Sequence, residues 1–131
     1  MKHILHLLII PIFFSCSVQD DCNTNYYCNQ FPYDDGWLNI DLTNNNNDSI
    51  LIILYHGYVE DHDVISQVYT QTNEYSFYLP ASERYAVEIY YNNGPTTTIA
   101  LDGGRLRQKT TTNCDETCYE EPKLNLNLRK L

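Results

Sequence analysis

Leucine and polar residues alternate without interruption in the stretch LNLNLR, residues 124–129. The side chains of a β-strand point alternately to its two sides, so the leucines would share one face of such a strand and the polar residues the other. The same period of two recurs in residues 38–42, 75–79 and 85–91. The pattern predicts half-buried β-strands.

Further segments with strand character are residues 64–72, 96–101 and 105–111. Residues 50–58 are apolar at nearly every position, which predicts a central strand covered on both faces. Turn-forming residues separate the segments, at 44–47, 60–63, 92–95 and 102–104. In particular, Asp102-Gly103-Gly104 predicts a hairpin. A loop at residues 113–118 precedes the last strand.

About seven to nine strands at a spacing of roughly 8 to 12 residues, with no long helical pattern, predict an all-β fold. The expected architecture is a two-sheet antiparallel β-sandwich. A chain of 131 residues has room for one such domain. We expect a signal peptide at residues 1–15, a lipidated tether and disulfide-bearing loop at 16–36, and the sandwich at 37–131.

The stretch LPASERYAVEI, residues 79–89, resembles the L-x-P-x-T-x-Y-x-V-x-V stretch of fibronectin type III and related immunoglobulin-like sandwiches. The resemblance implies a tyrosine corner, in which the hydroxyl of Tyr85 bonds an upstream backbone group and its ring packs in the core. Pro80 follows Leu79 directly and Trp37 lacks its usual neighbours, which departs from that family. The stretch fits transthyretin-like sandwiches equally, and these also end in an alternating leucine strand.

The N-terminus has the build of a bacterial lipoprotein signal peptide, with Lys2, an apolar run over residues 4–14, Ser15 and then Cys16. The run is far shorter than the ~20 residues of a membrane-spanning helix. Cleavage before Cys16 would make this cysteine the acylated first residue, anchored through palmitate-type chains. Phenylalanines precede Ser15 where smaller or aliphatic residues are usual. Ordinary cleavage after Ser17 is the alternative, and it would release a secreted or periplasmic soluble protein.

Two short stretches resemble features of Bacteroidetes-type envelope proteins. Residues 17–21, SVQDD, are similar to the acidic export signal of lipoproteins displayed on the outer face of the outer membrane. The resemblance implies a small surface-exposed envelope lipoprotein, although any flexible polar tether could have this composition. Asp48-Ser49-Ile50 is similar to the three-residue site that these bacteria O-glycosylate, and Ser49 lies in a predicted exposed turn.

Four of the five cysteines form two clusters, Cys22 with Cys28 and Cys114 with Cys118. In an exported chain they are expected to form disulfides, for which three pairings exist. Linking one cluster to the other is the favoured arrangement, because it closes a loop of roughly 90 residues and would stabilise the fold by about 4 kcal/mol. A four-thiolate zinc site is a weaker alternative, since the spacing lacks the usual CxxC pairs.

The formal charge of the chain is −9, and removal of Lys2 with the signal peptide makes it one unit more negative. Such a charge argues against nucleic acid as a partner. Arg84 is the only base between residues 17 and 103, and the remaining basic residues follow it. We expect these late basic strands to lie beside the early acidic ones.

His56, Asp61 and His62 are the candidates for a metal site, with calcium as an alternative ligand, or for acid–base chemistry. Their placement on a strand and its following turn specifies no rigid geometry. The sequence contains no nucleophile elbow, HExxH motif or phosphate-binding loop. We therefore expect no cofactor and no enzymatic activity.

The most consistent hypothesis is a lipid-anchored, non-catalytic binding or structural module whose partner is another envelope protein or a glycan. Twelve tyrosines make a carbohydrate-binding module an alternative. The candidate aromatic contacts are Tyr26, Tyr27, Tyr33 and Trp37 near the anchor, and Tyr90 and Tyr91 beside the predicted turn at 92–95. A small metal-dependent hydrolase using His56, Asp61 and His62 is the other.

Overall fold

The computed structural model describes residues 27–130, apart from the side chain of Asn93. Cys16 and the expected signal peptide lie outside the described residues. No helix in the described part is long and apolar enough to span a bilayer.

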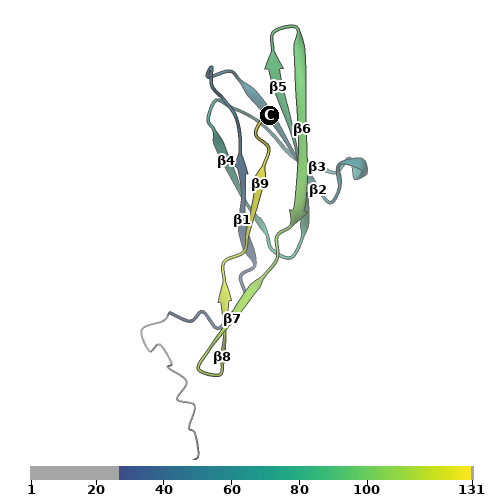
Figure 1. Ribbon diagram of the computed structural model, residues 1–131. Coiled ribbons are helices and arrows are strands. Elements are labelled where there is room, and N and C mark those ends of the chain that lie inside the picture. The colour runs from purple at the N-terminus through teal and green to yellow at the C-terminus, as the bar shows by residue number, and fades with distance from the viewer. Residues whose placement is uncertain (1–26, 131) are drawn as a thin grey trace, which may run out of the picture.

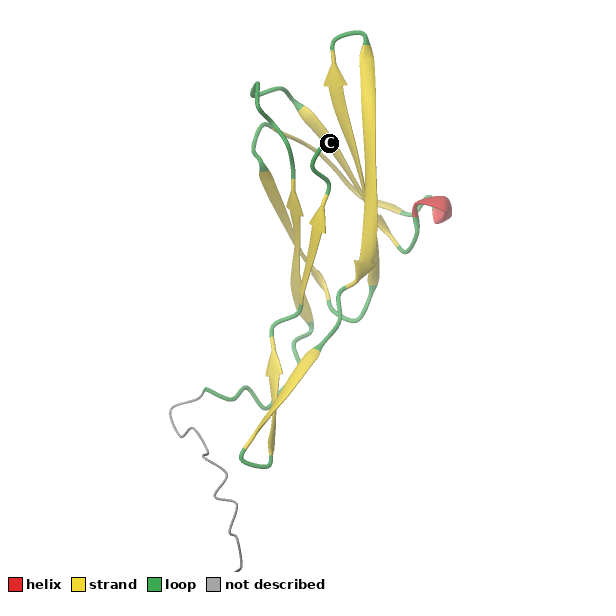
Figure 2. Ribbon diagram, in the orientation of Figure 1, coloured by secondary structure: helices red, strands yellow, loops and turns green. Residues whose placement is uncertain are grey.

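Within residues 27–130, nine strands and one short 3-10 helix form an all-β fold (Figures 1 and 2). The strands are β1 (Asp35–Asp41), β2 (Ile50–His56), β3 (Val64–Thr70), β4 (Glu74–Pro80), β5 (Arg84–Asn93), β6 (Thr96–Arg105), β7 (Lys109–Asn113), β8 (Glu116–Glu120) and β9 (Lys123–Asn127), with η1 (Val59–Asp61) between β2 and β3. Three strands form one sheet in the order β4-β1-β9, and four form the other in the order β3-β2-β5-β6. The two sheets face each other as a sandwich (Figure 1).

The core lies between the two sheets and is built from the residues whose alternation predicted the strands. Leu38 and Ile40 of the three-stranded sheet pack against Ile52, Val87 and Ile89 of the four-stranded sheet, and all five are fully buried. Leu126 and Leu128 complete the core beside β1. The prediction of a β-sandwich is therefore confirmed.

β2 occupies the centre of its sheet, as predicted, but it is covered on one side only. Ile50, Ile52 and Leu54 are buried in the core, whereas on the other side Leu51 and Ile53 are half-buried and Tyr55 is buried beside Glu88. The expectation of a strand covered on both faces is wrong, because no second layer lies over this side within the described residues.

The predicted hairpin at residues 102–104 is also wrong. β6 runs straight through this stretch and pairs Gly103 with Ala86 and Gly104 with Tyr85. A Cβ atom on Gly103 would lie 2.7 Å from the Tyr85 carbonyl oxygen, and one on Gly104 would lie 2.9 Å from Leu124 Cδ1. The glycines permit these close approaches and do not form a turn.

A two-strand hairpin, β7–β8, replaces the predicted loop at residues 113–118. Cys114 and Asp115 form its turn with φ angles of 52° and 65°, the left-handed conformation that a tight two-residue hairpin requires. The hairpin projects beyond one end of the sandwich, where it meets residues 27–34 (Figure 1). We call this end, made of residues 27–34 and β7–β8, the base.

A disulfide between Cys28 and Cys118 closes the base across a sequence separation of 90 residues. This is a link between the two cysteine clusters, as expected. Cys114 is also disulfide-bonded, and Cys22 lies outside the described residues. In the loop-entropy account, a closure of this length stabilises the fold by about 4 kcal/mol.

β1 and β9 run parallel, which differs from the predicted antiparallel sandwich. Both strands start near the base, β1 after residues 27–34 and β9 after the β7–β8 hairpin (Figure 1). Since they set out from the same end of the sandwich, the first and last strands of the domain pair in the same direction.

Candidate binding surface

The three residues predicted as a metal or acid–base site, His56, Asp61 and His62, do not come together. The His56 ring lies between two carboxylates, with Nδ1 3.2 Å from Asp63 Oδ2 and Nε2 3.4 Å from Glu83 Oε2. Hydrogen bonding to Glu83, and then to Asp63, raises the pKa of His56 above its usual value. No group of three His, Cys, Asp or Glu side chains suited to a metal ion occurs among the described residues.

Asp61 and His62 shape the turn around η1. Asp61 Oδ2 accepts a hydrogen bond from the Tyr58 backbone N–H at 3.0 Å. His62 has a left-handed backbone, with φ 55°, and its N–H donates to the Val59 carbonyl at 3.0 Å. The arrangement holds a loop in place and leaves each of the two side chains apart from His56.

Tyr85 and Ser49 are the two other residues that the sequence marked out, and the Tyr85 ring lies beside that of His56, with centroids 6.0 Å apart. Tyr85 is 2% exposed, and its hydroxyl donates to the Pro80 carbonyl at 2.9 Å, five residues upstream. That is the geometry of a tyrosine corner. Ser49 is exposed in the loop between β1 and β2, directly before Ile50.

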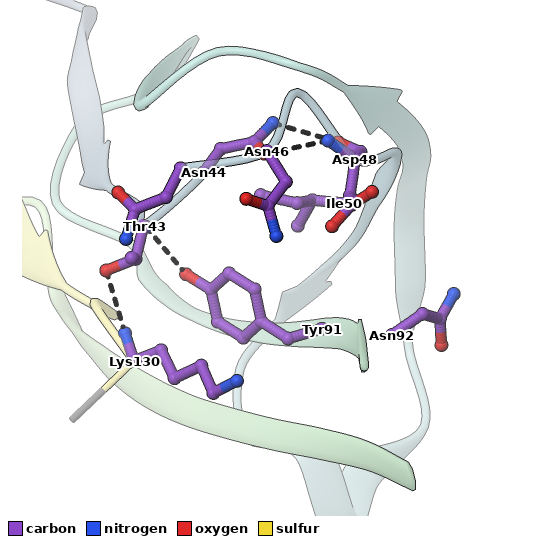
Figure 3. Close-up of a pocket in the computed structure, with 9 residues that line it drawn as sticks. Thr43, Asn44, Asn46, Asp48, Ile50, Tyr91, Asn92 and Lys130 are labelled. Atoms are coloured by element: carbon purple, nitrogen blue, oxygen red, sulfur yellow. Dashed lines mark hydrogen bonds between the residues drawn. The ribbon is translucent and has the colours of Figure 1, made fainter. Parts of the chain in front are cut away.

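A small polar pocket lies at the end of the sandwich opposite the base (Figure 3). Its volume is about 80 Å³, and it is lined by Thr43, Asn44, Asn45, Asn46, Asp48, Ile50, Tyr91, Asn92 and Lys130. The Asn44 side chain donates to the Asp48 carbonyl and accepts from the Asp48 N–H. The Tyr91 hydroxyl accepts from Thr43 N–H and donates to the Leu128 carbonyl. The pocket has room for two or three water molecules. The residues that line it are hydrogen-bonded to one another and to Leu128, and these bonds join the loops at this end of the sandwich.

The outward side of the three-stranded sheet is polar, and we call it the polar face. Asn39 donates to Asn125 Oδ1 at 2.9 Å and accepts from the Ser76 hydroxyl at 2.9 Å, so the three strands are joined by a side-chain ladder. Arg129 lies 3.5 Å from Asp41, the single such pair of a late basic with an early acidic residue in the described chain. Nearer the base, the rings of Trp37 and Tyr78 pack with centroids 4.8 Å apart.

The outward side of the four-stranded sheet is apolar. The register of the strands places nine apolar side chains on this side, which we call the apolar face: Leu51, Ile53, Tyr55, Val64, Tyr69, Ala86, Tyr90, Ile99 and Leu101. One row crosses all four strands as Tyr69, Leu51, Tyr90 and Ile99. Tyr69 is 71% exposed, Ile99 54% and Leu101 55%.

Glu88 is the one charged residue in the middle of the apolar face. Its carboxylate accepts a hydrogen bond from the Tyr55 hydroxyl at 2.8 Å. Burial of Tyr55, together with this carboxylate, raises the pKa of the tyrosine to about 12. Because Glu88 already has a neutral donor, covering this part of the face would not leave its carboxylate unpartnered.

The loop around η1 stands out from the sandwich at the side of the apolar face that is nearer the base (Figure 2). Its entry is fixed by Gly57, whose N–H donates to the Arg84 carbonyl at 2.7 Å. Gly57 has φ 81°, and a Cβ atom there would lie 2.8 Å from Asp61 Oδ2. His56, held by Asp63 and Glu83, ties the same loop to the corner before β5.

A pocket of about 260 Å³ lies between this loop and strands β5 and β6. Its lining residues are Tyr58, Val59, Glu60, Arg84, Ala86, Leu101, Asp102 and Gly103. The guanidinium carbon of Arg84 lies 4.2 Å from the centre of the Tyr58 ring, a cation–π contact. We call this space the loop pocket. It adjoins the apolar face, since Leu101 belongs to both.

Comparison with protein-family models, curated proteins and solved structures finds no match to this chain.

Sequence reasoning singled out the polar loop at residues 60–63 and missed both the apolar face and the loop pocket. One strand of the apolar face could be predicted from the sequence, because residues 50–58 are apolar on both sides of the strand. The loop pocket could not be predicted, because the sequence pattern at Gly103, which lines it, indicates a turn. Glu83 was missed because it reaches His56 from a corner 27 residues later in the chain.

Proposed function

We propose that this chain is a lipid-anchored bacterial envelope protein that acts without catalysis, by binding another protein through the apolar face. The anchor rests on the sequence around Cys16. The binding role is supported by one observation above all. Of the ten large apolar side chains that are most exposed in the described chain, six belong to the four-stranded sheet and its η1 loop: Tyr58, Val64, Ile65, Tyr69, Ile99 and Leu101.

A gathering of this kind is uncommon on proteins that stay alone in water, because every exposed apolar group costs free energy of hydration. Single exposed apolar residues need no explanation. A row of apolar side chains that crosses four neighbouring strands does need an explanation, and such rows usually belong to a protein–protein interface.

The edges of the two sheets support the same assignment. Edge strands are commonly guarded by charge or proline, which prevents pairing with other chains. β4 carries Glu74 and Pro80, and β9 carries Lys123. β3 has no charged residue, and β6 has none before Asp102. The sheet with the apolar face thus also has the less protected edges.

Co-purification from the envelope tests this proposal. We expect the chain to retain an envelope protein partner that is lost when Leu101 is replaced by lysine. Asn39→Lys is the matched control on the polar face and should retain the partner. Equal recovery with both variants, or no partner with the unaltered chain, would contradict the proposal.

A glycan is the second candidate ligand, on different residues. Trp37 is 38% exposed and Tyr78 51%, and their ring pair lies beside the amide ladder of Asn39 and Asn125. Aromatic faces next to amides suit the stacking and hydrogen bonding of a sugar. Trp37 is the single tryptophan of the chain, so oligosaccharide titrations that change its fluorescence would support this candidate, and an unchanged spectrum would end it.

A further inference from the structure

Two arginines lie directly opposite each other at the end of the apolar face nearer the base. Arg84 of β5 pairs with Arg105 of β6 in the strand register, so both side chains are on the outward side. Like charges placed directly across a strand pair repel and destabilise the sheet. The chain has a net charge of −9, with 8 basic and 17 acidic residues, so two facing arginines are not expected from its composition.

Neither arginine has a carboxylate partner among the described residues. The ion pairs there involve His56, with Asp63 and Glu83, and Arg129, with Asp41. Arg84 Nε is buried and has no hydrogen-bond acceptor in the described chain. A buried guanidinium N–H without an acceptor costs free energy, and an anion bound to the arginine would supply that acceptor.

The loop pocket gives that anion a place beside Arg84. Ala86 and Gly103 face each other across β5 and β6 and contribute almost no side chain, which leaves the space between the strands and the loop open. Tyr58 lies against the Arg84 guanidinium and orients it. Leu101 lines the side of the pocket that continues into the apolar face.

We propose that the loop pocket binds a carboxylate that a partner protein presents beside an apolar side chain, as an acidic residue or a C-terminus. The carboxylate would take the free donors of Arg84 and reduce its repulsion with Arg105, and the apolar side chain would lie on Leu101. This inference rests on the proposed function, because it names the chemistry of the protein that binds the apolar face.

Charge complementarity selects the ligand class. The planar guanidinium group matches the two oxygens of a carboxylate, and the pair can form two parallel hydrogen bonds. Glu60 and Asp102 also line the pocket, so a dianion such as phosphate meets more repulsion there than a monoanion does. The apolar neighbour Leu101 favours a carboxylate attached to a peptide over a free hydrophilic acid.

Nuclear magnetic resonance titration of the full chain carrying Cys16→Ala tests the proposal with defined probes. The peptides are N-acetyl-Leu-Phe with a free C-terminus and N-acetyl-Leu-Glu-Leu-amide, and their neutral counterparts are N-acetyl-Leu-Phe-amide and N-acetyl-Leu-Gln-Leu-amide. We expect saturable shifts of the Ala86, Leu101 and Gly103 amide signals. At least one carboxylate peptide should bind tenfold or more tightly than its neutral counterpart, and which one does so shows the source of the carboxylate.

Arg84→Gln should remove this tenfold preference. Arg129→Gln is the matched control, because that arginine already has Asp41 as its partner, and the preference should remain. Arg84→Lys keeps the charge but loses the planar fork, so it should keep part of the preference. Amide spectra of each variant show whether it is folded, and Arg105→Gln, which should weaken carboxylate binding less, provides a second substitution at the same site.

Equal binding of the neutral peptides, or the absence of saturable shifts, would overturn the proposal. Tighter binding of inorganic phosphate or of glucuronate than of either carboxylate peptide would also overturn it, since the ligand would then not be a peptide carboxylate. If Arg84→Gln keeps the co-purified partner while Leu101→Lys loses it, this inference fails and the proposed function stands. If neither substitution changes the recovery, the proposed function fails.

Discussion

The two outward faces of this sandwich are built from the same alternating pattern, but they differ in how their side chains are occupied. On the polar face, Asn39, Ser76 and Asn125 are hydrogen-bonded to one another across three strands. On the apolar face, Ile99 and Leu101 are more than half exposed. The amide and hydroxyl groups of the polar face thus find their hydrogen-bond partners within the described chain. The exposed apolar side chains of the apolar face, and the arginines at its end, are instead suited to contact with a partner.

The largest expected effect lies outside both faces, at the base. Replacing Cys28, Cys114 and Cys118 together by serine, so that the second disulfide at Cys114 does not keep the base cross-linked, should lower the free energy of unfolding by about 4 kcal/mol, because a cross-link here restricts the unfolded chain across 90 residues. Chemical denaturation measures this loss. Since the base is remote from the apolar face, the folded triple variant should keep its partner, and a selective loss of binding would show that the base contributes to the apolar face.

The polar face should matter for stability. Asn39→Ala removes two cross-strand hydrogen bonds and should cost roughly 1 to 3 kcal/mol, at about 0.5 to 1.5 kcal/mol for each bond. Denaturant unfolding with Asn127→Ala, on the same side of the neighbouring strand, is the comparison. If both variants are as stable as the parent chain, the ladder is not what holds this face together.

The apolar face should matter little for stability. Ile99→Thr combined with Leu101→Thr should change the free energy of unfolding by less than about 0.5 kcal/mol, because exposed side chains contribute little to the folded state and threonine suits a strand. The same variant should lose its partner. A destabilisation of several kcal/mol would mean that these residues serve the fold itself.

The smallest expected effect concerns the η1 loop that borders the apolar face. Glu83 and Asp63 raise the pKa of His56, so the folded state binds its proton more tightly than the unfolded state. The resulting stabilisation is fully present below the ordinary histidine pKa of about 6.5 and is lost as the pH rises through the raised value. Melting curves of the chain and of His56→Gln should therefore differ more at pH 5 than at pH 9, and an equal difference at both would contradict the account.

How far the sequence predicted this structure can be judged from individual residues. The inward positions were predictable, because Leu38, Val87 and Leu126 follow the strand period and are buried. Gly103 was misassigned because a glycine needed for close approach of two strands has the same local signal as one in a turn. The proximity of Arg84 and Arg105 depends on the register of β5 and β6, which local pattern does not specify.

The candidate site was the less predictable part for the same reason. The apolar run over residues 50–58 predicted that Leu51 would be covered, and no local pattern shows that Leu51 and Leu101 lie on one exposed face. The polar cluster at residues 60–63 drew attention by its chemistry, and in the structure it supports the loop. What the sequence did predict correctly was the connection of the two cysteine clusters, since Cys28 and Cys118 are bonded.

Photo-crosslinking at two matched tyrosines tests the central claim most directly. Tyr69 and Tyr78 are both exposed on edge strands, the first on the apolar face and the second on the outward side of the other sheet. A photoreactive phenylalanine analogue should be placed at each position in turn, in the cells that make the protein. The account predicts a protein adduct from position 69 that disappears with Leu101→Lys, and none from position 78. The same adduct from both positions, or an adduct from position 78 alone, would contradict it.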